Sequence, residues 1–173
     1  MKKKYFYTFA LLALVLLSQC GPTTQDAIDY NDELIAEELL VIDRINDLDN
    51  AMATWNPKEI EPALDAAKVQ IDKSIKILEG LGGFDGDNSF VDACLELFKV
   101  FKSQVNDEYA EQLGIIKIYN DTPNSYTTVE ENRYNAINDI LDEEYYPVFD
   151  KFSVAQEDFA DKWGFMLDYS SNY

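Results

Sequence analysis

The chain has 173 residues, with 33 aspartates and glutamates against 14 lysines and arginines, and it contains no histidine. Such an acidic surface repels the phosphate backbone, so a nucleic-acid partner is not expected. The lack of histidine excludes Ser-His and Cys-His catalytic pairs, the usual zinc sites and the Glu-x-x-His di-iron motif of ferritin-like bundles.

The first 19 residues have the three-part layout of an export signal. Lysines at positions 2–4 are followed by an apolar run from Tyr5 to Leu17, and the chain then turns small and polar at Ser18. A spanning helix needs about 20 apolar residues, and this run is shorter. We therefore predict that residues 1–19 are a signal peptide that is removed from the mature chain.

The end of this leader, Leu17-Ser18-Gln19-Cys20, resembles the lipobox of bacterial lipoproteins. The resemblance implies that Leu17, Ser18 and Gln19 are recognised by the signal peptidase, and that Cys20 carries fatty acids such as palmitate and becomes the first mature residue. Gln19 departs from the family pattern, which usually has glycine, alanine or serine there. In such lipoproteins an aspartate directly after the cysteine retains the protein at the inner membrane. This chain has Gly21 at that position, so the resemblance implies the outer membrane. Whether the domain faces the periplasm or the cell surface stays open.

Cleavage would leave 11 basic residues against 33 acids, a net charge of −22, because three lysines and no acid precede Cys20. The remaining length suits one domain. We predict a tether over residues 20–25, a helical domain over 26–168 and a frayed tail over 169–173. Acylation would use Cys20 and leave Cys94 as a small buried hydrophobe, since the neighbouring Asp92 and Glu96 do not favour a thiolate.

Apolar residues recur at spacings of three, four and seven over residues 26–54, which predicts the first helix. Pro57 cannot continue that helix, and Asn56 with Glu59 forms a capping box for the next one. Gly80, Gly82 and Gly83 are expected to end the second helix. So short a junction makes the first two helices antiparallel neighbours.

The loop after the second helix contains a pattern that partly matches a calcium site. Counted from Asp85, the residues Asp87, Ser89 and Glu96 fall at ligand positions of an EF-hand-like loop, but Phe90 stands where the turn requires glycine. Asp85 and Asp87 are thus only weak candidates, and the sequence predicts no metal. The preferred interpretation is a turn in which Asn88 or Ser89 caps the third helix.

The third helix is predicted to run without a break from about Ser89 to Tyr119. A capping box at Thr127 and Glu130 opens the fourth, which should continue to about Leu167. A kink over residues 143–146 is expected because of Pro147, and two shorter helices are the alternative. No stretch alternates like a strand. Four helices with short loops predict an all-α, antiparallel (up-down-up-down) four-helix bundle.

Two groups of acids could carry chemistry, Glu37-Glu38 and Asp142-Glu143-Glu144. Paired carboxylates can transfer protons or hold a hard cation. Consecutive residues on a helix point to different sides, however, so we interpret both groups as solvated helix faces. No nucleophile–base pair and no cofactor motif accompanies them, so neither an enzyme nor a cofactor is expected.

The lipobox, the short spacer and an acidic opening helix containing Tyr30-Asn31 together resemble a family of small bacterial surface lipoproteins with no assigned activity. That resemblance implies no catalytic residues. The expected function is a non-enzymatic, lipid-anchored outer-membrane protein that binds an unknown protein, peptide or other envelope component. The alternative is a helical bundle that holds a small molecule or cation among Tyr109, Tyr134, Tyr145 and nearby acids.

Overall fold

The computed structural model describes residues 21–168, apart from the side chain of Asn124. Over that range the helices are α2 (Thr24–Met52), α3 (Pro57–Leu81), α4 (Ser89–Asn106), α5 (Glu108–Asp121), the 3-10 turn η1 (Pro123–Ser125) and α6 (Thr128–Trp163). These residues contain no strand, so the all-α prediction is confirmed. The predicted signal peptide, Cys20 and the tail at 169–173 lie outside the described residues.

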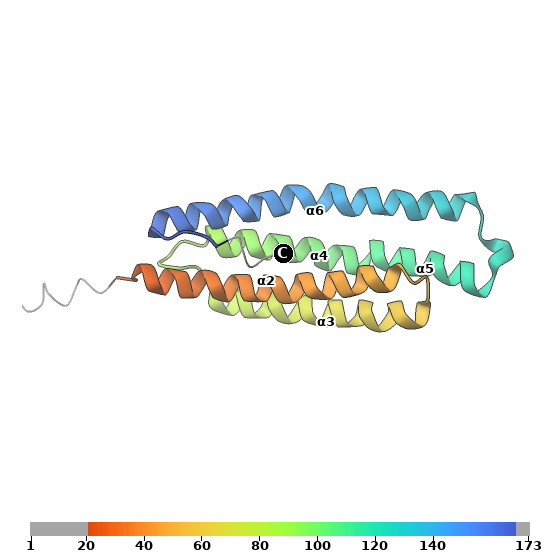
Figure 1. The fold of residues 1–173 in the computed structure, drawn as a ribbon, viewed down its shortest axis with the longest axis horizontal. Helices are drawn as coiled ribbons and strands as arrows, with labels where there is room; N and C mark the ends of the chain where they lie inside the picture. Colours follow the sequence, from red (N-terminus) through yellow and green to blue (C-terminus); the bar gives the residue numbers. More distant parts are fainter. Residues whose placement is uncertain (1–20, 169–173) are drawn as a thin grey trace, which may run out of the picture.

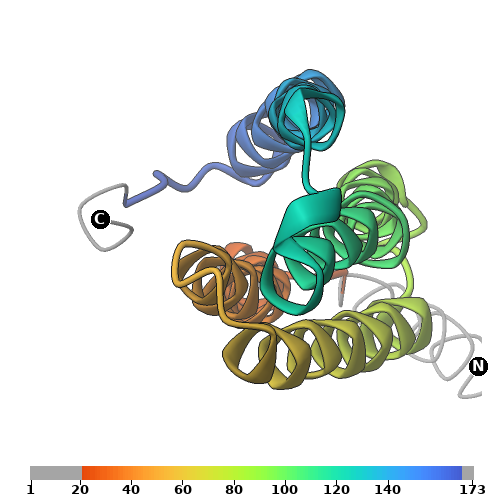
Figure 2. The same ribbon diagram turned by 90° about the vertical axis from the view of Figure 1, so that its right-hand side faces the viewer.

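The helices lie side by side along the long axis of the molecule, and the chain turns back after α2, α3 and α5 (Figure 1). Seen from the end, α3 and α6 are on opposite sides, with α2 and the α4–α5 pair between them (Figure 2). The closest packing is between α2 and α3 and between α4 and α6, whereas α2 and α6 meet only sparsely. Within residues 21–168 no helix combines the length and hydropathy that a membrane span requires.

Side-chain caps fix the starts of the first two helices. The Thr23 and Asp26 side chains form a capping box, so α2 begins two residues before the predicted Asp26. Asn56 accepts from the Lys58 amide at 3.2 Å and donates to the Glu59 carboxylate at 2.7 Å, as its position before Pro57 predicts. The sequence therefore marks the junction between α2 and α3 correctly.

The third predicted helix is interrupted at Asp107, which separates α4 from α5 with φ −109° and ψ −71°. Polar side chains compete with the helical backbone there. The Asn106 amide donates to the Lys102 carbonyl at 2.7 Å, and the Ser103 hydroxyl donates to the Asp107 carboxylate at 3.3 Å. The prediction of an unbroken helix is thus wrong at this point.

The last helix, α6, passes through Pro147 without interruption, so the alternative of two shorter helices is wrong. Pro147 is exposed, and solvent can satisfy the helix carbonyl that it leaves without a donor. The helix ends at Trp163, earlier than the predicted Leu167, because Gly164 adopts a left-handed conformation with φ 71°. The Phe165 amide then donates to the Ala160 carbonyl at 3.1 Å and completes the cap.

The core forms where the apolar stripes of the helices meet along the molecule. Its fully buried side chains include Leu34, Val41, Leu48, Ile60, Ile71, Leu78, Leu97, Phe98, Val105, Ile116 and Ile137. Each large side chain contributes roughly 1.5–3 kcal/mol through its burial. Cys94 is also fully buried, which confirms its predicted place in the core. Burial raises the pKa of its thiol, and the nearby Glu38 and Glu37 add to that rise.

Candidate functional site

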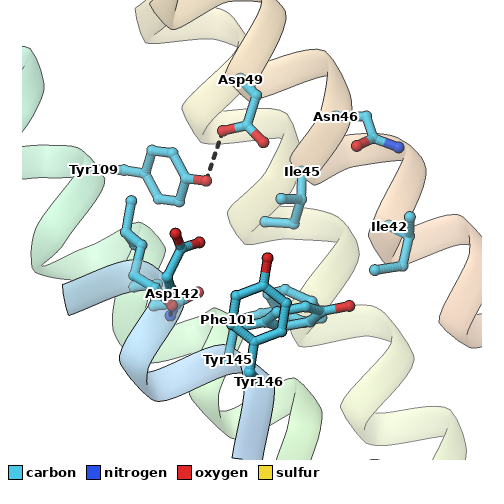
Figure 3. A pocket seen from close by; sticks show the side chains of 11 residues that line it. Ile42, Ile45, Asn46, Asp49, Phe101, Tyr109, Asp142, Tyr145 and Tyr146 are labelled. Carbon is cyan, nitrogen blue, oxygen red and sulfur yellow. Dashed lines mark hydrogen bonds between the residues drawn. The ribbon is translucent and has the colours of Figure 1, made fainter. Parts of the chain in front are cut away.

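A pocket of about 260 Å³ lies where α2 and α6 face each other, with α4 and α5 forming its floor (Figure 3). We call it the α2–α6 groove. It opens where the packing between these two helices is sparse, and side chains from α2, α4, α5 and α6 border it. Its lining consists of Ile42, Ile45, Asn46, Asp49, Phe101, Gln104, Tyr109, Leu141, Asp142, Tyr145 and Tyr146.

One end of the groove is acidic. The Tyr109 hydroxyl donates a 2.6 Å hydrogen bond to the Asp49 carboxylate, and Asp142 lies close by on α6 (Figure 3). Desolvation raises the pKa of Asp49 although part of this residue is open to solvent, and the hydrogen bond from Tyr109 opposes the rise. Burial, then the adjacent Asp49 charge, raises the pKa of Tyr109. Tyr109 therefore stays protonated at neutral pH and acts as the donor of the pair.

The other end of the groove is aromatic and apolar. The ring centroids of Phe101 and Tyr145 are 5.6 Å apart, and those of Tyr145 and Tyr146 are 5.4 Å apart. Ile42 and Ile45 of α2 face these rings across the opening (Figure 3). A ligand that fills the whole groove would therefore meet carboxylates at one end and ring faces at the other.

Gln104 connects the floor of the groove to α6. Its side chain is only 3% exposed. Its amide nitrogen donates to the Leu141 carbonyl at 3.0 Å and lies 3.5 Å from a Glu144 carboxylate oxygen. A buried amide that is held in this way gives the groove a fixed polar group.

The structure brings together two of the three tyrosines that the sequence proposes for a ligand site. Tyr109 and Tyr145 line the groove with Asp142. Tyr134 lies elsewhere, with its ring centroid 5.0 Å from that of Trp55. The sequence reasoning missed Asp49 as a site residue. Its signal was present, because Asp49 follows Ile42 by seven residues and places a carboxylate on the apolar stripe of α2.

The two acidic groups of the sequence have different environments. Asp142, Glu143 and Glu144 are exposed, as predicted. The prediction of a solvated face is wrong for Glu38, which is only 8% exposed. Glu37 accepts a 2.6 Å hydrogen bond from the Ser74 hydroxyl of α3. Within residues 21–168 the Glu38 carboxylate has no hydrogen-bond or ion-pair partner, and desolvation raises its pKa to about 7.

The weak metal candidates do not form a site. Asp87 uses both carboxylate oxygens, one for the Ser89 amide at 2.9 Å and the other for the Lys162 ammonium at 2.6 Å. Asp87 therefore supplies the side-chain cap that was expected from Asn88 or Ser89, and Asn88 makes no such bond. Asp85 is exposed with φ 50°. The described part of the chain contains no group of three or more acidic or cysteine side chains that could hold a metal ion.

A second pocket, of about 420 Å³, lies between the start of α4 and the last turns of α6. It is larger and mainly apolar, with Phe90 and Phe159 among its lining residues. Its two lysines already have partners, since Lys151 pairs with Glu96 and Lys162 pairs with Asp87. The second pocket thus has no unpaired lysine charge, and the α2–α6 groove has the more distinctive chemistry.

No protein-family model matches this chain, and no curated protein and no solved structure resembles it closely enough to count as a match.

Proposed function

We propose that this protein is a non-enzymatic lipoprotein of the bacterial outer membrane, in which an up-down-up-down helical bundle serves as a binding module. The α2–α6 groove is the observation that carries the binding role. It combines a fixed buried amide, two carboxylates and several aromatic rings in one opening. Ligand sites are typically concave, largely apolar and supplied with a few convergent polar groups, and the groove has these properties.

The membrane anchor in this proposal rests on Leu17-Ser18-Gln19-Cys20. Two or three acyl chains on one cysteine give stable attachment, at about 0.8 kcal/mol for each buried methylene. The net charge of −22 after Cys20 supports the same picture, because it keeps the bundle soluble beside an anionic membrane. The partner in the envelope would thus meet a tethered acidic particle.

Mass spectrometry of the mature N-terminal peptide tests the anchor. We expect a peptide that begins at Cys20 and carries the mass of attached acyl chains, and we expect the protein in the outer-membrane fraction. Cys20→Ala should abolish both results. An intact precursor in the cytoplasm, or an unmodified Cys20 in the cell-associated protein, would overturn the placement.

A photo-crosslinker at the edge of the groove tests the binding role in intact cells. Tyr146 is 57% exposed and lines the groove, so we expect a benzoylphenylalanine at this position to form a discrete adduct. Val69 on α3 is 69% exposed and provides the control position, where no such adduct is expected. Equal adducts at both positions, or none at either, would count against a binding site in the groove.

The alternative function, a helical bundle that holds a small molecule or cation, would use the same groove. It is favoured by the position of Tyr109 and Tyr145, which the structure places in one lining. A pocket of about 260 Å³ admits either a small molecule or one side chain of a larger partner. The two functions therefore differ in the size of the occupant.

A further inference from the structure

The groove has unmet hydrogen-bond acceptors and no cation of its own. No lysine or arginine is among its lining residues. Asp49 uses one carboxylate oxygen for Tyr109, and its second oxygen has no donor among the described residues. The Asp142 carboxylate and the side-chain oxygen of Gln104 also have no donor within that part of the chain. An occupant that satisfies these groups must bring donors.

The nearest basic residues along the same helices are engaged elsewhere. Arg44 of α2 pairs with Asp47 at 2.7 Å, and Lys102 of α4 pairs with Asp72 at 2.7 Å. Internal cations therefore do not neutralise the acidic end of the groove. The net charge of the mature chain further favours the approach of a positively charged ligand and disfavours an anion.

We propose that the α2–α6 groove binds a primary ammonium or guanidinium group carried on a short alkyl stem. The cationic head lies between Asp49 and Asp142, where its N–H groups also reach the Gln104 oxygen. The stem lies against Phe101 and Tyr145. This inference names the ligand class for the binding module proposed above and therefore rests on that proposal.

Three physical features favour this ligand over other small molecules. A charge-assisted hydrogen bond to a carboxylate is about twice as strong as a neutral one. The tyrosine and phenylalanine rings attract a cation through their faces and accept an alkyl stem. A bare divalent ion is a poorer match, because the lining supplies only two carboxylates and the two amide oxygens of Asn46 and Gln104.

The size of the groove limits the stem. A volume of about 260 Å³ suits a group comparable to a lysine or arginine side chain. Two sources could present this chemistry, a free alkylamine or a basic side chain in a flexible peptide. Both place the same head and stem in the groove, and they differ in whether additional contacts form outside it.

Isothermal titration of the protein isolated from its cells provides the test, with butylammonium and butylguanidinium as probes. We expect saturable binding at one site per chain. Butanol and butyrate have the same stem with a neutral or anionic head, and neither should bind measurably. Affinity should fall at acidic pH, because Asp49 then becomes protonated and its pKa is already raised by desolvation.

Variants separate the groove from the general acidity of the chain. Asp49→Asn keeps an acceptor for Tyr109 and removes the charge, so we expect at least a tenfold loss of affinity, and the same for Asp142→Asn. Asp43→Asn is the matched control, because Asp43 is an exposed acid of α2 outside the groove. Its affinity should stay within twofold of the wild type. Circular dichroism confirms that each variant is folded.

Several outcomes would overturn the inference. They are an equal loss with Asp43→Asn, binding of butanol as tight as that of butylammonium, or no saturable binding of either cation. Failure here leaves the crosslinking test at Tyr146 unaffected, since that adduct does not depend on the charge of the occupant.

A comparison of spermidine with an unstructured peptide that contains one arginine identifies the source of the bound cation. The tighter binder of the two shows whether contacts outside the groove contribute.

Discussion

The hydroxyl of Tyr109 on α5 donates a 2.6 Å hydrogen bond to the carboxylate of Asp49 on α2, across a separation of 60 residues. This bond joins two helices that are distant in the sequence, just beyond the interruption of the chain at Asp107. It also fixes one wall of the α2–α6 groove. A buried tyrosine and a half-solvated carboxylate therefore depend on each other for position.

Tyr109→Phe should destabilise the protein by about 0.5–1.5 kcal/mol, because it removes this hydrogen bond while solvent can still reach the Asp49 carboxylate. The loss of this hydrogen bond should also raise the pKa of Asp49 further, since the bond now lowers it. Urea unfolding gives the stability change. Tyr146→Phe is the control, because Tyr146 is 57% exposed and should tolerate the change. Equal stabilities for the two variants would contradict the role of the bond.

Glu38→Gln should stabilise the protein at neutral pH. The pKa of Glu38 is raised to about 7 from an ordinary 4.5 because burial penalises the charged form. Between these values the unfolded chain has lost the proton and the folded chain has kept it, so rising pH lowers the free energy of unfolding. The variant should match the wild type near pH 4.5 and exceed it by up to about 3 kcal/mol above pH 7.

Chemical denaturation at a series of pH values measures this difference. Glu33→Gln provides the control for the loss of one negative charge, because Glu33 is an exposed acid on the same helix. A Glu38→Gln difference that does not grow between pH 4.5 and 7 would show that the carboxylate is solvated in the folded protein.

The sequence predicts the fold well where the determinants are local. The caps at Asn56 and Thr127 involve residues within three positions of each other, so their spacing is sufficient to identify them. The break at Asp107 was missed because the apolar periodicity continues across it. Pro147 was expected to kink or split a helix, and its exposure on α6 explains why the helix continues.

The site was less predictable because its residues come from four helices. Asp49 and Tyr109 are neighbours only after α2 and α5 have packed, and the sequence around each residue does not indicate that it contacts the other. Glu38 and Glu37 have the same sequence context, yet one is buried without a partner and the other meets Ser74 of α3. Periodicity identified the apolar faces, but it could not show where two helices leave an opening.

Cys94 should be unreactive in the folded protein. It is fully buried, and burial raises the pKa of its thiol, so little thiolate is available to attack a reagent. A chromogenic disulfide reagent should therefore label no Cys94 under native conditions. After denaturation it should label one thiol per chain when Cys20 is acylated, and two when Cys20 is free in an unprocessed chain. Cys94→Ala should remove the single thiol that is labelled after denaturation of the acylated chain. Rapid labelling of the native protein would contradict the buried position of Cys94.

Two glycine substitutions should change stability in opposite directions. Gly164 ends α6 with φ 71°, which an alanine adopts with strain, so Gly164→Ala should cost about 1 kcal/mol. Gly114 lies inside α5 with open space around its Cβ position, so Gly114→Ala should stabilise the helix by about 0.5–1 kcal/mol. For a domain of this size each kcal/mol shifts the Tm by roughly 2–4 °C, which thermal unfolding by circular dichroism resolves. A lower Tm for both variants would show that Gly114 has a packing role, and a higher Tm for both would show that α6 does not need the left-handed cap at Gly164.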